Sequence, residues 1–270
     1  MIKCTVWLLI LGTLAISASE PECRVYSKTP QGELSLCIYS PAVSTKPSPA
    51  VVFFFGGGWR NGSINQFKPH SVHLASRGMV SIVADYRVNS RQKTTPYESV
   101  EDAMAAMVWV RKHAMELNID PQRIAAGGGS AGGHLAAATA TLAGSETVRP
   151  NALLLFNPVL DVTETGVGSG LFGPDPNKGS PMQHVSKGMP PTLIQHGTAD
   201  TTVKIEQAER FCRLMTTAGN RCKLIPYEAA THGFFNYKEN TDNKHFKLTL
   251  QAADDFLVSL GWLPENLKSH

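Results

Sequence analysis

Short apolar runs alternate with segments of helical spacing along most of the chain. Compact runs rich in Val, Ile and Phe are typical of strands, and apolar residues three or four apart are typical of helices. The expected strands cover 23–27, 33–39, 50–55, 79–84, 123–127, 151–156, 192–196 and 222–228, and the expected helices cover 66–76, 97–117, 131–142, 204–217 and 246–260. This alternation predicts an α/β fold with a mostly parallel central sheet and helices on both faces. In such sheets ligands bind at the carboxyl ends of the strands, so functional residues should directly follow strands.

The first residues follow a different pattern. Lys3 precedes an apolar run over 6–16, and small residues follow at 17–19. A basic start, a short apolar run and small residues predict a signal peptide over 1–19, which leaves 20–270 as the mature domain. A buried first helix is the alternative. The run is shorter than the ~20 residues that span a bilayer, so we expect export to the periplasm or the outside without membrane insertion.

Composition adds bounds on size and partners. The chain has 270 residues, of which 42% are hydrophobic and 17% are charged, and this suits one globular domain. A formal net charge of +3 is too small to suggest a nucleic-acid partner. Residues 160–190 are rich in Gly and Pro and have no clear period, so we expect a short cap or pocket insertion there. The oligomeric state is not indicated.

Five cysteines are present, and Cys4 falls in the expected signal peptide. Export favours disulfides among the remaining four. Cys23 and Cys37 flank a turn and could face each other across a hairpin, while Cys212 ends a helix just before Cys222 begins a strand. We favour these two local pairings, with four buried thiols as the alternative. No Cys or His spacing resembles a zinc site, so no metal is expected.

A candidate nucleophile lies in the segment 128–132, which matches the pattern G-x-S-x-G around Ser130. With 23 glycines in the chain, chance alone gives this pattern in roughly one such chain in seven. The context raises its weight, because the segment follows a buried strand and opens a helix, as a nucleophile elbow does. The alternative is a serine that only caps a helix in a glycine-rich turn.

A serine nucleophile needs a base, and the base needs a carboxylate that holds its tautomer. His232 follows the last expected strand, and Asp200 follows the strand before it. The chain order Ser130, Asp200, His232 is the order found in α/β-hydrolases. Asp85 and Asp161 also follow strands and are rival acids, but Asp85 precedes the serine. We therefore predict a catalytic triad of Ser130, Asp200 and His232.

Three glycines at 56–58 directly follow the strand 50–55. Glycine lets backbone N–H groups approach a ligand closely, so we predict an oxyanion hole formed by the N–H groups of Gly57, Gly58 and Ala131. A flexible connector is the alternative. Trp59 either lines an acyl pocket or shields the loop, and the sequence does not separate these two interpretations.

Taken together, five segments resemble the α/β-hydrolase esterases of the hormone-sensitive-lipase and acetyl-esterase kind, and most of all exported bacterial feruloyl and acetyl xylan esterases. These segments are 55–59, 85–87, 128–133, 196–200 and 232–234. The resemblance implies an α/β-hydrolase fold and ester hydrolysis through an acyl-enzyme, with no cofactor. Asp161 and Phe234 join Trp59 as candidate pocket residues.

Two positions depart from this family. Many relatives have His where this chain has Phe55, so the oxyanion loop should be supported differently here. Many also have Asp where this chain has Gly129. Neither departure removes a predicted triad member.

The function that fits best is an exported serine carboxylesterase acting on short acyl or aromatic esters. Its substrate would be a small ester or an acylated polysaccharide, and the polysaccharide preference comes from the resemblance alone. One alternative is a serine peptidase of the prolyl-oligopeptidase type, although the chain has little room for a gating domain before the glycine loop. Another is a non-catalytic hydrolase fold kept for binding.

Overall fold

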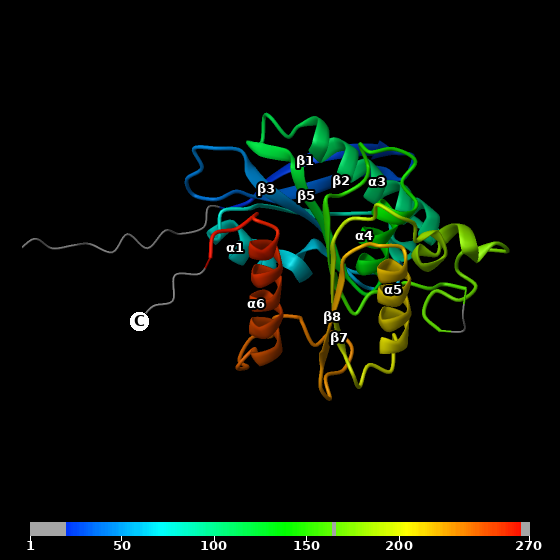
Figure 1. The fold of residues 1–270 in the computed structure, drawn as a ribbon. Helices are drawn as coiled ribbons and strands as arrows, with labels where there is room; N and C mark the ends of the chain where they lie inside the picture. Colours follow the sequence, from blue (N-terminus) through cyan, green and yellow to red (C-terminus); the bar gives the residue numbers. More distant parts are fainter. Residues whose placement is uncertain (1–19, 164–165, 266–270) are drawn as a thin grey trace, which may run out of the picture.

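Eight strands form one twisted sheet in the computed structural model, which describes residues 20–163 and 166–265 (Figure 1). The strands are β1 (Glu22–Thr29), β2 (Gly32–Tyr39), β3 (Ser48–Phe54), β4 (Val80–Ala84), β5 (Ile119–Gly129), β6 (Ala152–Phe156), β7 (Thr192–Gly197) and β8 (Cys222–Tyr227). Their order in the sheet is β1-β2-β4-β3-β5-β6-β7-β8. The pairs β1–β2 and β2–β4 are antiparallel. All five remaining neighbouring pairs in this order are parallel, which confirms the predicted mostly parallel sheet.

Helices cover both faces of the sheet, as Figure 1 shows. One apolar cluster packs α1 (Lys68–Ser76) and α6 (Lys244–Ser259) against the first face. A second cluster packs α3 (Pro96–Lys112), α4 (Ala131–Thr141) and α5 (Ile205–Thr217) against the other. The short elements are α2 (Asn89–Gln92) and the 3-10 helices η1 (Ile64–Phe67), η2 (Pro176–Gly179) and η3 (Pro181–His184). Strands buried on both faces explain the continuous apolar runs of the sequence.

Several helix boundaries differ from the sequence prediction, and two of them matter here. The helix expected over 97–117 ends at Lys112, and the chain turns until Asn118, whose φ of 52° lies in the left-handed region. Met115, which falls within the expected helix, lies in this turn and is 94% exposed. The helix expected over 66–76 begins only at Lys68, so Gln66 belongs to η1 instead. This second difference matters for the active site.

Two disulfides join elements that are neighbours in the fold. Cys23 pairs with Cys37 between β1 and β2, and Cys212 pairs with Cys222 between α5 and β8. These are the two local pairings favoured from the sequence. The fifth cysteine and the expected signal peptide lie outside the described residues.

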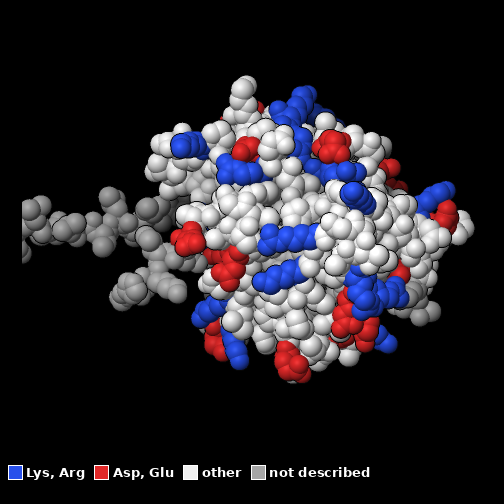
Figure 2. Space-filling model, viewed as in Figure 1, with Lys and Arg blue, Asp and Glu red and all other residues white. Residues whose placement is uncertain are grey.

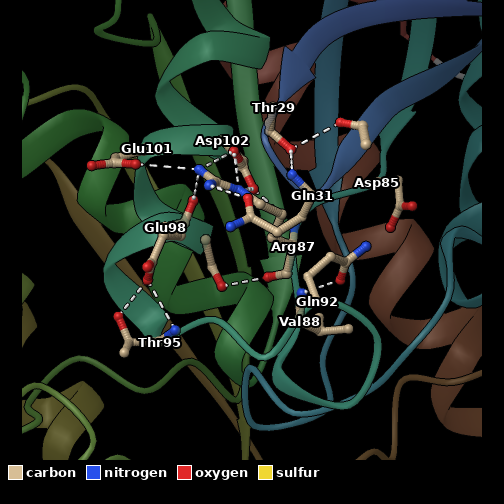
Figure 3. A network of polar contacts seen from close by, with 12 residues as sticks. Thr29, Gln31, Asp85, Arg87, Val88, Gln92, Thr95, Glu98, Glu101 and Asp102 are labelled. Atoms are coloured by element: carbon tan, nitrogen blue, oxygen red, sulfur yellow. Dashed lines mark hydrogen bonds and ion pairs between the residues drawn. The ribbon is translucent and has the colours of Figure 1, made fainter.

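A buried ion pair anchors the loop that follows β4 (Figure 3). The Arg87 guanidinium donates to both carboxylate oxygens of Asp102 on α3 at 2.8–3.0 Å, and the Arg87 N–H donates to the same carboxylate at 2.8 Å. Gln31, in the β1–β2 turn, and Glu101 also contact the guanidinium. Burial raises the pKa of Asp102, and the bonds from Arg87 oppose this. The network ties the hairpin, the loop and α3 together.

Charged residues of both signs are interspersed on the face drawn in Figure 2. That face has no continuous stripe of Lys and Arg. None of the helices in the described part of the chain is long and apolar enough to cross a membrane.

Candidate active site

Ser130 lies at the sharp turn between β5 and α4, with φ 55° and ψ −119°. A non-glycine residue in this region is strained, and such strain is typical of nucleophile elbows. The glycines around it are required by close packing. A Cβ on Gly132 would lie 2.0 Å from the Phe54 carbonyl oxygen, and a Cβ on Gly129 would lie 2.3 Å from the Phe235 ring. Phe235 thus leaves no room for a side chain at Gly129.

The structure brings the three predicted triad residues together. His232 Nε2 lies 3.0 Å from Ser130 Oγ, and His232 Nδ1 lies 2.7 Å from Asp200 Oδ2. The Asp200 side chain is fully buried, while that of His232 is 26% exposed. These contacts suit proton transfer from the serine to the imidazole, with the carboxylate fixing the Nδ1–H tautomer.

Asp200 is held by its own loop. Its Oδ1 accepts from the backbone N–H groups of Thr202 and Val203 at 2.9 Å each. His196 Nε2 lies 3.4 Å from Oδ2 and also donates to the Val203 carbonyl at 2.8 Å. Burial alone would raise the pKa of Asp200, but the hydrogen bonds from His196, His232 and the Val203 N–H outweigh it and hold the pKa well below its usual range. The carboxylate is therefore ionised opposite the imidazole.

The glycine loop lies over the nucleophile. A Cβ on Gly56 would come within 3.4 Å of Ser130 Cβ, and one on Gly57, where φ is 127°, would lie 2.1 Å from the Asn61 carbonyl oxygen. Within the described residues, the N–H groups of Gly57 and Gly58 donate to no protein acceptor. Ala131 is the first residue of α4, where helix N–H groups point outward. These three donors are therefore free to meet an oxyanion beside Ser130.

Phe55 and two distant side chains support this loop. The Phe55 ring stacks on Tyr86 with centroids 4.1 Å apart, and the Tyr86 hydroxyl donates to the Phe55 carbonyl at 2.7 Å. Gln66 Oε1 accepts from the Gly56 N–H at 2.6 Å. Stacking and these two bonds therefore support the loop around Phe55. The sequence analysis missed Gln66, because its region resembled an ordinary helix start.

Trp59 is 2% exposed and has a φ of 57°. Its ring meets those of His134 and Phe172 edge to face, with centroids 5.0 and 5.4 Å apart. Phe172 belongs to the segment expected as a cap. Trp59 also lines a cavity of about 480 Å³ beside Gly58, so it both shields the loop and borders a pocket.

The other two candidate pocket residues make structural contacts. Asp161 is 2% exposed, pairs with Arg210 at 2.5 Å and accepts from the Thr163 hydroxyl at 2.6 Å. Phe234 packs against Tyr227 with centroids 4.9 Å apart. Neither lines the cavities that reach Gly57 or Gly58. Phe234 lines a separate cavity of about 310 Å³ beside the start of α6, and the pocket role of both residues stays a prediction.

A cavity of about 1060 Å³ begins at the glycine loop and runs between η1, α1 and α6. Its lining combines polar and apolar side chains, which include Gln66, Lys68, Tyr237, Glu239, Phe246 and Leu250. Among the described residues, no group of His, Cys, Asp and Glu could hold a metal ion. The chemical groups at hand are thus a hydroxyl, an imidazole, a carboxylate and backbone donors beside an open cavity.

Comparisons with known proteins bear on the fold and on the activity. The BD-FAE family model matches residues 36–161. Esterase 2 of the Planctomycetes species Thermogutta terrifontis, solved with propionate bound, is 44% identical, with a TM-score of 0.85 over 92% of this chain and 97% of that one. This likeness confirms the α/β-hydrolase fold.

Two further relatives are curated esterases. Carboxylesterase NlhH of Mycobacterium tuberculosis is 28% identical over 80% of this chain and 77% of its own length. Acetylxylan esterase of Xylanibacter ruminicola is 29% identical over 68% of this chain and 41% of its own length. These likenesses favour the esterase interpretation over a peptidase or a binding protein. The chain therefore belongs to the α/β-hydrolase esterases and is a carboxylic ester hydrolase.

Proposed function

We propose that Ser130, His232 and Asp200 hydrolyse short acyl esters through an acyl-enzyme. The main support for this proposal is the 3.0 Å contact between His232 Nε2 and Ser130 Oγ, beside the free N–H groups of the glycine loop. Ser130 Oγ attacks the ester carbonyl carbon while its proton moves to His232 Nε2. The resulting oxyanion accepts hydrogen bonds from Gly57, Gly58 and Ala131.

The tetrahedral intermediate collapses when the bond to the alcohol oxygen breaks and His232 gives that oxygen its proton. Water then attacks the acyl carbon with His232 as the base. The proton returns to Ser130 Oγ as the carboxylic acid leaves. Asp200 stays ionised throughout and stabilises the imidazolium, in keeping with its lowered pKa. The likeness to an esterase solved with propionate supports a short acyl group.

The alcohol part of the substrate is a larger group, for which an acylated polysaccharide is the best candidate. A cavity of about 1060 Å³ far exceeds the needs of a short acyl chain. It offers hydrogen-bonding side chains and the ring of Tyr237, which is 48% exposed. Polar groups beside an exposed aromatic ring suit a sugar, which has hydroxyls at its edge and an apolar face. The likeness to an acetylxylan esterase points the same way.

We also propose that residues 1–19 are a signal peptide and that the mature domain, 20–270, acts outside the cytoplasm. Two disulfides support this, because such bonds persist mainly in oxidising compartments. Edman sequencing of protein recovered from the periplasm or medium should begin near residue 20, and a cytoplasmic protein with an intact start would contradict it.

The nucleophile and the substrate are tested together. Hydrolysis of p-nitrophenyl acetate and of acetylated xylo-oligosaccharides is measured for the wild type and Ser130→Ala. The Ser130→Ala rate should fall by at least about 10³-fold on both substrates. Equal rates in the two proteins would refute Ser130 as the nucleophile.

The sugar subsite is tested with Tyr237→Ala. This change should lower kcat/KM about fivefold for the oligosaccharide and leave p-nitrophenyl acetate within about twofold, since stacking is worth ~1 kcal/mol. Leu248→Ala is the matched control, because Leu248 is 46% exposed on α6 outside the cavity lining. An equal loss on both substrates would reject the sugar subsite while leaving the esterase mechanism standing.

A further inference from the structure

The Gln66 side chain bridges the loop of Gly56 and the loop of Asn236, and Asn236 lies 170 residues after Gln66 in the sequence. It projects from η1, which begins after Ser63, whose hydroxyl accepts from the Asn65 N–H at 3.3 Å. Gln66 Oε1 accepts from the Gly56 N–H at 2.6 Å, and Gln66 Nε2 donates to Asn236 Oδ1 at 3.0 Å. One amide therefore connects the oxyanion loop with the segment that follows His232.

The bonds of this amide fix its orientation. The Gly56 backbone N–H can only donate, so the atom of Gln66 that faces it must be the oxygen. The Gln66 nitrogen must then face Asn236, and the Asn236 oxygen must accept. Rotating either amide would place two donors or two acceptors together. The bridge thus has one satisfied arrangement.

Both ends of the bridge adjoin reacting groups. Gly56 packs over Ser130 and immediately precedes the donor Gly57. Asn236 lies in the same turn as His232, where its N–H donates to the Gly233 carbonyl at 3.1 Å. The spacing between the oxyanion donors and the imidazole thus depends on one side chain from a third segment.

We propose that Gln66 is a positioning residue that sets the distance between the oxyanion loop and the His232 turn. This inference rests on the proposed function, because it assumes that Ser130 and His232 perform the chemistry. A misplacement of about 1 Å can cost ~10²-fold in rate, and each oxyanion donor contributes ~10²–10³-fold to kcat. Loss of the bridge therefore acts on the transition state more than on substrate binding.

The test substitutes Gln66→Met, which keeps the length of the side chain and removes both bonds. With p-nitrophenyl butyrate we expect kcat to fall about 10- to 100-fold while KM stays within about threefold. The Ki of an alkyl trifluoromethyl ketone, which forms a tetrahedral oxyanion on a serine, should rise by about the same factor as kcat/KM falls. Inhibition by butyrate should stay within about threefold.

Gln207→Met is the matched control. Gln207 is also half-buried, and its Oε1 accepts from the N–H groups of Leu160 and Asp161 at 3.1 and 3.2 Å, away from the oxyanion loop. This variant should lower Tm but keep kcat and the ketone Ki within about threefold of the wild type. A merely structural Gln66 would behave in the same way.

Asn236→Ala breaks only the far end of the bridge and should lower kcat about 3- to 10-fold. The proposal is overturned if Gln66→Met keeps kcat within threefold, if its loss lies in KM, or if Gln207→Met loses as much. The Ser130→Ala variant distinguishes a failure of the proposed function from a failure of the Gln66 bridge. Full activity of Ser130→Ala would refute the proposed function, whereas an inactive Ser130→Ala with a fully active Gln66→Met would refute the bridge alone.

Discussion

The two sides of Ser130 are held in place in different ways. On the acid–base side, the end of β7 and the loop that follows it supply Asp200 together with most of what fixes it, namely His196 and the N–H groups of Thr202 and Val203. On the oxyanion side, the glycine loop depends on side chains from separate segments, Tyr86 and Gln66. The acid–base side is thus local and charged, and the oxyanion side is distributed and mostly neutral.

This difference has consequences for substitution. A local charged group has no substitute, so its loss should be severe and chemical in kind. Distributed neutral bonds share the task, so each loss should be smaller and should appear partly as lost stability. The following changes test this contrast in decreasing order of expected effect.

Asp200→Asn should be the most damaging change on the acid–base side. The amide leaves His232 in the wrong tautomer and removes the charge that stabilises the imidazolium, and the analogous change in a serine protease lowers kcat ~10⁴-fold. We expect kcat for p-nitrophenyl acetate to fall about 10³- to 10⁴-fold. Asp85→Asn is the control, since Asp85 pairs with Arg91 instead, and its kcat should stay within about threefold. A similar loss of kcat in both variants would contradict the role of Asp200 as the carboxylate that orients His232.

Asp102→Ala tests the support beneath the oxyanion side. It would leave the Arg87 guanidinium, 9% exposed, without its buried partner, which typically costs ~3–5 kcal/mol of stability. Because the loop that Arg87 anchors also bonds to Trp59 and Arg60, the loss should appear first in Tm, lowered by roughly 6–15 °C. Glu146→Ala breaks an ion pair of which Glu146 is 83% exposed and should leave Tm unchanged. An unchanged Tm for Asp102→Ala would show that the Arg87–Asp102 network does not stabilise the loop beneath the site (Figure 3).

The local side is also the one that the sequence predicts well. Ser130, Asp200 and His232 each directly follow a strand, so chain order and strand ends suffice to bring them together. The β-strands themselves are predictable because burial on both faces leaves continuous apolar runs.

The distributed side escapes sequence analysis for a physical reason. The Gln66 amide donates a hydrogen bond to the Asn236 side chain, and nothing in the spacing of two neutral polar residues marks such a contact. The role of Gly129 likewise depends on the ring of Phe235, which arrives from far along the chain. Packing of this kind is decided by the folded backbone, so the sequence alone does not indicate that Asp161 pairs with Arg210 or that Phe234 packs against Tyr227.

A pH titration probes the buried histidines. His70 on α1 is fully buried among aromatic rings, which include Phe67 and Phe235, and burial lowers its pKa to about 3. Since the unfolded histidine takes up a proton near pH 6.5 and the folded one does not, stability falls as pH drops below 6.5. At pH 5 the loss from His70 is about 2 kcal/mol. Asp200, whose pKa is lowered, contributes stability above its ordinary pKa of ~3.8 and loses it only below that.

The free energy of unfolding, measured in urea, should therefore be lower at pH 5 than at pH 7.5, with His70 contributing to the difference. His134, with a pKa lowered to about 4 by burial, adds a similar loss beneath Trp59. His70→Leu should remove about 2 kcal/mol of the difference between the two pH values. A variant with the same difference as the wild type would show that His70 is not the group that titrates.

Tyr86→Phe should have the smallest effect and probes one neutral bond of the distributed side. The ring and its stacking on Phe55 remain, but the Phe55 carbonyl loses the hydroxyl that donates to it inside the core. Such a loss typically costs ~1 kcal/mol, so Tm should fall by roughly 2–4 °C. We expect kcat to fall only about two- to fivefold, because Gln66 still holds Gly56.

Tyr97→Phe is the matched control, since the Tyr97 hydroxyl donates to the carbonyl oxygens of Phe172 and Asp175 instead. It should leave kcat unchanged. If Tyr86→Phe instead lowered kcat as far as Asp200→Asn does, the position of the oxyanion loop would depend on one hydrogen bond, from the Tyr86 hydroxyl to the Phe55 carbonyl. The contrast between a local side and a distributed side would then fail, because one neutral hydroxyl would carry as much of the catalysis as the buried charge.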